Sequence, residues 1–163
     1  MASRLVRLGV IVLLTGCGGA GGGGVTPGSG GGGGSGGGGG SSQQLGSTPA
    51  DCVAYINSLR ATKGLPALAR WEDGEACANG EAQSDSQSGT PHGAFGTCHE
   101  HAQDECPGWR GLSSIVPGCL DMMWAEGPGG GHYDNMTSRS STKVACGFYT
   151  TSGGETWAVQ NFQ

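Results

Sequence analysis

The residues best suited to chemistry lie in the stretch WAEGPGGGHYDNM, from Trp124 to Met136. Glu126 supplies a carboxylate and His132 an imidazole, two groups that bind metal ions or transfer protons. The glycine-rich turn between them also invites comparison with a phosphate-binding loop. That class is excluded, because a P-loop needs G-x4-G-K-[ST] and no Lys or Arg lies between Arg110 and Arg139. The glycine-rich turn could instead be a hinge that brings two metal ligands together, or a simple connection.

Two other groups of residues offer weaker chemistry. The run from Cys98 to His101, Cys-His-Glu-His, could bind a metal, but oxidation of its cysteine would remove the thiolate ligand. An H-x-H pair in an exposed loop is more often simply solvated. Serines 113, 114 and 138–141 lack the G-x-S-x-G elbow of a serine hydrolase. We therefore expect no serine or cysteine nucleophile.

The cysteine count points to an exported, lipid-anchored chain. Seven cysteines are an odd number, which in an exported protein needs an explanation. The segment Leu14-Thr15-Gly16-Cys17 resembles the bacterial lipobox, whose Cys is diacylated and becomes the first mature residue. The remaining cysteines predict three disulfides, with fifteen pairings left open; they are Cys52, Cys77, Cys98, Cys106, Cys119 and Cys146.

The first 47 residues read as a signal and a tether. Arg4 and Arg7 precede an apolar run over residues 8–14 that is too short to span a bilayer, so residues 1–16 are predicted to be a lipoprotein signal peptide. Residues 17–47 comprise the lipidated Cys17 and a Gly/Ser-rich segment that we expect to be a disordered tether. Gly18, in place of Asp, favours the outer membrane or cell surface over the inner membrane.

Net charge limits the partners. The chain has 8 Lys and Arg against 13 Asp and Glu. Loss of Arg4 and Arg7 with the signal leaves a mature protein near −7 with scattered cations. Nucleic acid is therefore excluded as an expected partner. The predicted membrane contact is the lipid on Cys17 rather than a basic surface.

Residues 48–163 are expected to form one mixed α and β domain. Thr48 is a predicted N-cap, with Pro49 in the first turn and Asp51 in the capping-box position. Further helices are predicted at 72–86 and about 117–124, with a long disulfide-stapled loop over 88–112. Two strand-like runs, 143–151 and 155–163, flank Ser152-Gly153-Gly154 as a hairpin.

Several stretches, in this order, resemble the CAP superfamily, also called the SCP or pathogenesis-related-1-like domain. The resemblance begins with the helix YINSLR at 55–60, then GLPAL at 64–68 and Trp71. It continues with the loop residue His92 and with Trp124, Glu126 and Gly131-His132-Tyr133, which are similar to the family's W…E…GHY signature. It closes with VACGFY at 144–149 and WAVQ at 157–160. This resemblance covers almost all of 48–163.

The resemblance implies a three-layer α-β-α sandwich with two His and two acids in a cleft. Carried over by position, these are His92, Glu105, Glu126 and His132. Glu105 lacks the family's flanking Gly and Asn, so Glu100 or Asp104 could substitute for it. His99 or His101 could likewise replace His92. The glycine turn would then bring His132 to the cleft that contains Glu126.

Three functions follow as alternatives. The family's cleft and surface bind lipids, peptides or proteins, so an extracytoplasmic binding module is the leading interpretation and an enzyme is not favoured. A metal-dependent hydrolase would use a Glu105 or Glu126 base with zinc held by His92 and His132. A purely structural or adhesive module would use no cleft chemistry. For the four cleft residues, zinc binding and a hydrogen-bonded polar cluster both stay open.

Overall fold

The computed structural model describes residues 48–163. The predicted signal peptide (1–16), the lipidation site at Cys17 and the tether (17–47) lie outside the described residues. None of the helices in 48–163 is long and apolar enough to cross a membrane.

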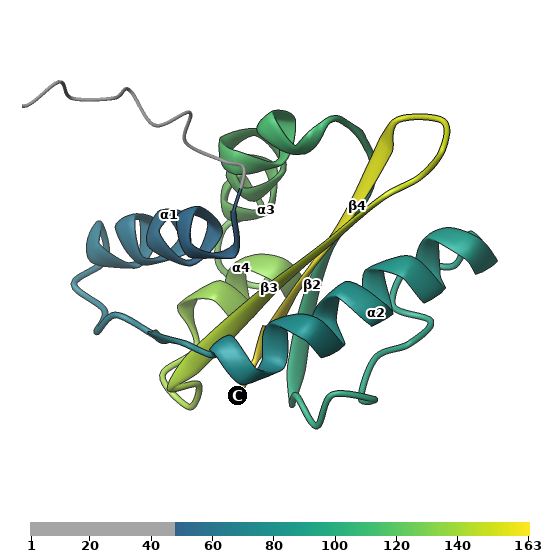
Figure 1. Ribbon diagram of the computed structural model, residues 1–163. Coiled ribbons are helices and arrows are strands. Elements are labelled where there is room, and N and C mark those ends of the chain that lie inside the picture. Colours follow the sequence, from purple (N-terminus) through teal and green to yellow (C-terminus); the bar gives the residue numbers. More distant parts are fainter. Residues whose placement is uncertain (1–47) are drawn as a thin grey trace, which may run out of the picture. The chain divides into compact units, whose positions relative to one another are not determined.

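One four-stranded sheet organises the described chain, and the helices α1 to α4 pack on it (Figure 1). The strands occur in the spatial order β1-β3-β4-β2; β1 is parallel to β3, and the other pairs are antiparallel. In chain order the elements are α1 (Pro49–Ala61), β1 (Ala69–Arg70), α2 (Glu72–Ser88), β2 (Ala102–Arg110), α3 (Leu120–Ala125), α4 (Gly131–Thr137), β3 (Lys143–Thr150) and β4 (Glu155–Phe162).

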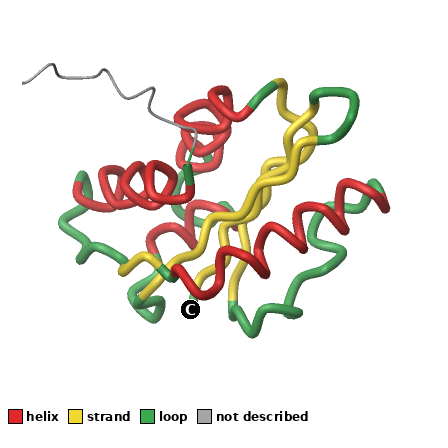
Figure 2. The backbone as a smooth tube through the Cα atoms, in the orientation of Figure 1, coloured by secondary structure: helices red, strands yellow, loops and turns green. Residues whose placement is uncertain are grey.

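The sheet separates two hydrophobic cores, which confirms the predicted three-layer α-β-α sandwich. Side chains alternate between the two faces of a strand. Val144 and Cys146 of β3 pack with α1, α3 and α4, whereas Ala145 packs with Ala78 and Ala82 of α2. Figures 1 and 2 show α2 along one face of the sheet, with the other helices on the opposite side.

The predictions with local signals are confirmed. Thr48 caps α1: its Oγ1 accepts from the N–H of Asp51 at 3.1 Å, and Pro49 lies in the first turn. The hairpin is present as β3 and β4 with the expected turn. Helix α2 begins at Glu72, as predicted, and ends at Ser88, two residues beyond the predicted end at 86.

Two predictions are wrong in detail. The segment predicted as a loop at 88–112 contains β2, which pairs with β4 from Ala102 to Arg110. Its strand pattern is hidden because polar side chains occupy both faces, and the register shifts between Cys106 and Trp109, around Pro107 and Gly108. The third helix, predicted from about 117, is α-helical from Leu120; the residues just before it, Ile115–Cys119, form an irregular helical turn in which Val116 has φ −114° and ψ 109°.

Small side chains let α2 lie very close to the sheet. A Cβ built at Gly147 of β3 would stand 2.2 Å from the Ala78 backbone carbon. Only glycine fits at that crossing, and Ala78 and Ala82 present the matching small surface. Helix α2 therefore brings its longer side chains, including Glu81 and Asp85, directly against the strands.

Each disulfide fixes one flanking segment. The three pairs use all six cysteines of 48–163, as the count predicts. Cys52–Cys146 ties α1 to β3, Cys77–Cys98 ties α2 to the loop that follows it, and Cys106–Cys119 ties β2 to the segment preceding α3. The predicted stapling of 88–112 is thus present, at Cys98 and Cys106.

Candidate functional site

Strand β2 places its residues alternately toward the two helix layers. Gln103 and Glu105 pair with Asn161 and Val159 of β4, so they point to the α2 face. Asp104, between them, points to the opposite layer, where its Oδ1 accepts from Asn135 Nδ2 of α4 at 2.8 Å. Because β2 is an edge strand, groups from both layers can meet along it.

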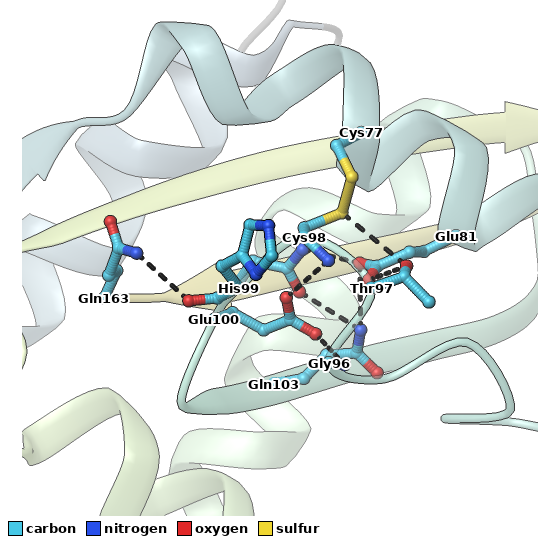
Figure 3. Close-up of a disulfide and its surroundings, with 10 residues drawn as sticks. Cys77, Glu81, Gly96, Thr97, Cys98, His99, Glu100, Gln103 and Gln163 are labelled. Atoms are coloured by element: carbon cyan, nitrogen blue, oxygen red, sulfur yellow. Dashed lines mark hydrogen bonds between the residues drawn. A yellow bond between two sulfur atoms is a disulfide. The ribbon is translucent and has the colours of Figure 1, made fainter.

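The loop that follows α2 is held to this edge by buried carboxylates. Every second backbone N–H from residue 92 to residue 98 donates to an acid: His92 to Glu105, Ala94 to Asp85, and Gly96 and Cys98 to Glu100. The intervening N–H groups of residues 93, 95 and 97 donate to carbonyls three residues earlier. Figure 3 shows the Gly96–Glu100 end of this arrangement beside the Cys77–Cys98 disulfide.

His92 is positioned through both its backbone and its ring. Its φ of 59° lies in the left-handed region, where a residue with a side chain needs support from its surroundings. Support comes from Glu105 Oε2, which accepts the backbone N–H, and from Gln103 Oε1, 2.8 Å from Nδ1 of the ring. Glu105 Oε2 itself lies 3.9 Å from that Nδ1.

Glu126 and His132 meet across the glycine turn of Trp124–Met136. Glu126 caps the end of α3, and His132 lies in the first turn of α4. Glu126 Oε1 is 2.5 Å from Nδ1 of His132, and Oε2 accepts the backbone N–H of His132 at 3.2 Å. Gly130 is required here, because a Cβ would lie 2.4 Å from Cβ of Glu126. The hydrogen bond from His132 lowers the pKa of Glu126.

The four predicted residues surround two adjacent hollows rather than one point. His92 and Gln103 line a hollow of about 370 Å³, and Glu105, Glu126 and His132 line a second of about 350 Å³. The rings of His92 and His132 stack with centroids 6.3 Å apart, one from each hollow. We use the term cleft for these two hollows together.

The alternative residues take other places. Asp104 faces α4, and Glu100 is buried in the loop network described above. His101 lines the His92 hollow, and its Nε2 lies 3.0 Å from Ser141 Oγ. His99 binds through its backbone carbonyl to Gln163. Of the three candidate acids, Glu105 is the one whose carboxylate contacts His92.

The side chains do not fit a tetrahedral zinc site as arranged. A zinc ion needs four donor atoms within about 2.0–2.3 Å of it. Each histidine Nδ1 has a hydrogen-bond partner, which leaves Nε2 as the possible metal donor of each ring, but the donor atoms of the four predicted residues do not converge on one point. Across 48–163, the one group whose ligand atoms converge is Glu81, Cys98 and Glu100, and that sulfur is in a disulfide. In this arrangement the four predicted residues all take part in hydrogen bonds.

Burial makes Glu105 a weaker acid than an exposed glutamate. Its side chain is 0% exposed, and burial, reinforced by the neighbouring carboxyls of Asp85 and Glu81, raises its pKa from 4.5 to about 7. The N–H of His92 opposes this shift by stabilising the charged form. Burial also raises the pKa of Asp85. Asp85 Oδ2 and Glu105 Oε1 are both buried and have no hydrogen-bond partner among the described residues.

Comparison with known proteins identifies the family. Residues 53–162 match the CAP family, described as the Cysteine-rich secretory protein family. The chain belongs to this family. Among solved structures, it is similar to an outer surface protein from Borrelia burgdorferi, with 20% identity and a TM-score of 0.52 over 68% of this chain and 87% of that one. This likeness supports the fold. No curated protein matches the chain.

Sequence reasoning missed Gln103, which is the residue that directly contacts the ring of His92. The signal was available in principle: in a strand, residues 103 and 105 share a face. Treating 88–112 as a loop concealed it. Glu81 and Asp85 were also missed, since they appear in the sequence as ordinary polar positions of a weakly apolar helix.

The buried carboxyl of Glu105 predicts a pH-dependent stability. Since its folded pKa is raised, the folded state binds more protons than the unfolded chain between pH 4.5 and about 7. The free energy of unfolding should therefore fall as pH rises through this window, by up to roughly 3 kcal/mol from this group. Chemical denaturation should show a shallower fall for Glu105→Gln than for the wild type. The exposed Glu155→Gln variant is the matched control, and a wild-type curve parallel to that of Glu105→Gln would contradict the prediction.

Proposed function

We propose that the protein is a lipid-anchored binding module of the bacterial cell envelope. Cys17 would carry the lipid after removal of residues 1–16, and residues 17–47 would tether the CAP domain to the outer membrane or cell surface. The cysteine pairing supports export, because disulfides persist in oxidising compartments. It also leaves Cys17 as the one cysteine outside the described pairs. The surface location in the name of the Borrelia protein agrees with this proposal.

The binding proposal rests on the composition of the second hollow, the one that Glu126 lines. Glu105, Glu126 and His132 line it together with an apolar wall of Pro107, Trp109, Met122 and Met123. Met122 is 65% exposed and adds apolar contact surface beside the buried Met123. The hollow therefore suits an amphipathic ligand, a lipid or an apolar peptide segment with one polar group.

Binding accounts for the cleft better than hydrolysis does. A general base must contact the water or group that it deprotonates, and the side chain of Glu105 is fully buried. Glu126 is engaged by both the ring and the backbone of His132. We therefore do not assign a metal-dependent hydrolase activity to this arrangement.

The anchoring proposal is tested by following Cys17 in intact cells. We expect the full chain to incorporate an alkyne-labelled fatty acid and to fractionate with membranes, because the lipobox cysteine is its acylation site. Cys17→Ala should lose the label and leave the membrane fraction. Gly18→Asp, a matched variant beside the same cysteine, should keep the label and enrich in the inner membrane. Membrane retention of unlabelled Cys17→Ala would overturn the proposal.

The binding proposal is tested by native mass spectrometry of the full chain purified from its own envelope. We expect a co-purified lipid or peptide adduct on the wild type, and at least a tenfold lower adduct fraction on Trp109→Ala, since this removes an aromatic wall. Lys63→Ala, an exposed position after α1, should retain the adduct. Equal adduct on both variants, or none on the wild type, would favour the structural or adhesive alternative.

A further inference from the structure

A chain of hydrogen bonds runs from the interior of the α2 layer to the ring of His92. It begins at Glu81, which is 2% exposed and accepts from three side chains. Thr97 Oγ1 donates to Oε1 at 2.8 Å, whereas Gln103 Nε2 and Asn161 Nδ2 donate to Oε2 at 3.1 and 2.5 Å. Figure 3 shows Glu81 between Thr97 and Gln103.

Glu81 can fix the direction of these bonds because Oε2 acts only as an acceptor. Two amide donors occupy this oxygen. Burial and the neighbouring Glu100 raise the pKa of Glu81. If Glu81 is protonated, the proton is on Oε1, because two amide donors occupy Oε2, so the role of Oε2 is the same in either state.

The amide of Gln103 consequently has one orientation. Its Nε2 donates to Glu81 Oε2 and also to Asn161 Oδ1 at 3.1 Å, which uses both of its hydrogens. The reverse orientation would put the Gln103 carbonyl against a carboxylate and a second carbonyl, with no donor between them. Asn161 is fixed in the same way, because its own Nδ2 donates to Glu81. Gln103 Oε1 is therefore the atom that faces His92.

An amide oxygen opposite Nδ1 determines the tautomer of His92. The 2.8 Å contact with Gln103 Oε1 requires hydrogen on Nδ1. In the neutral ring, Nε2 then carries the lone pair. The side chain is 41% exposed and lines the hollow shared with Gln103, so this lone pair is available to the cleft.

We propose that Glu81 and Gln103 are positioning residues that hold neutral His92 as its Nδ1–H tautomer, so that Nε2 is a hydrogen-bond acceptor of the cleft. His132 is set up differently, since a carboxylate rather than an amide faces its Nδ1. The two stacked rings are thus chemically distinct. The inference goes beyond the proposed binding function and does not depend on it, because the tautomer exists before any ligand binds.

Histidine side-chain NMR on the full chain tests the proposal. In protein labelled with ¹⁵N-histidine at a pH where the rings are neutral, long-range ¹H–¹⁵N correlations distinguish the two tautomers. The His92 signals, assigned by their loss in His92→Gln, should show hydrogen on Nδ1. In Glu81→Gln the new amide can present either its oxygen or its NH2 group to Gln103, so the orientation of Gln103 is no longer fixed. We expect a mixture of the Nδ1–H and Nε2–H patterns of His92 in place of the single Nδ1–H pattern.

Two further variants keep the test decisive. Gln103→Leu removes the acceptor and should also abolish the preference for Nδ1–H, which covers the case in which Glu81→Gln fails to fold. Gln103→Glu, with a proton on the oxygen that faces Glu81, retains an acceptor opposite His92 and should preserve Nδ1–H. The signals of His132 should not change in any of the three. A wild-type His92 with hydrogen on Nε2, or an unchanged Nδ1–H pattern in folded Gln103→Leu, would overturn the proposal.

Discussion

The cleft depends on an irregular loop whose backbone is bound by buried carboxylates. Between residues 92 and 98, alternate N–H groups donate to Asp85, Glu100 and Glu105, while the others close short turns within the loop. Such a loop lacks the regular backbone hydrogen bonds of a helix or sheet, and buried N–H groups without acceptors would destabilise the folded state. The carboxylates satisfy them from α2, from β2 and from the end of the loop. This arrangement places His92 at the edge of the sheet.

The rest of the fold makes this burial of acids possible. Burying a carboxyl is unfavourable unless it is hydrogen bonded, and several are buried side by side here. The close approach of α2 at Gly147 brings Glu81 and Asp85 within reach of β2. Cys77–Cys98 restrains the far end of the loop, and a disulfide typically contributes about 2–4 kcal/mol by constraining the unfolded chain. Packing and covalent restraint together offset the cost of the polar interior.

On the other side of β2, the second histidine is positioned by simpler means. The glycine turn joins α3 to α4, and Gly130 lets the backbone pass against Glu126. Buried Arg60 stabilises the C-terminal end of α4, because its Nη1 donates to the carbonyls of Met136 and Ser138 at 2.7 and 3.0 Å. The desolvation of Arg60 lowers its pKa, and it lies among carbonyls rather than carboxylates. The two histidines thus reach one cleft from opposite layers, through unlike supports.

The sequence predicted those parts whose signals are local. The cap at Thr48 and the Ser152–Gly154 turn are written in neighbouring residues, and the family resemblance supplied the order of the layers. Strand β2 was missed because its alternation serves polar contacts on both faces, with Gln103 and Glu105 toward α2 and Asp104 toward α4. The disulfide pairing and the acceptors of the loop amides depend on segments distant in sequence. Only the three-dimensional structure brings these together.

Amide hydrogen exchange in the 92–98 loop tests the central claim most directly. The experiment uses the full chain with its disulfides intact, in the presence of EDTA, so that no metal can order the loop. The account predicts that the N–H groups of residues 92, 94, 96 and 98 exchange at least about a hundredfold more slowly than in an unfolded peptide, although they belong to no helix or strand. Exchange at unfolded-peptide rates, or protection that appears only when zinc is added, would contradict it.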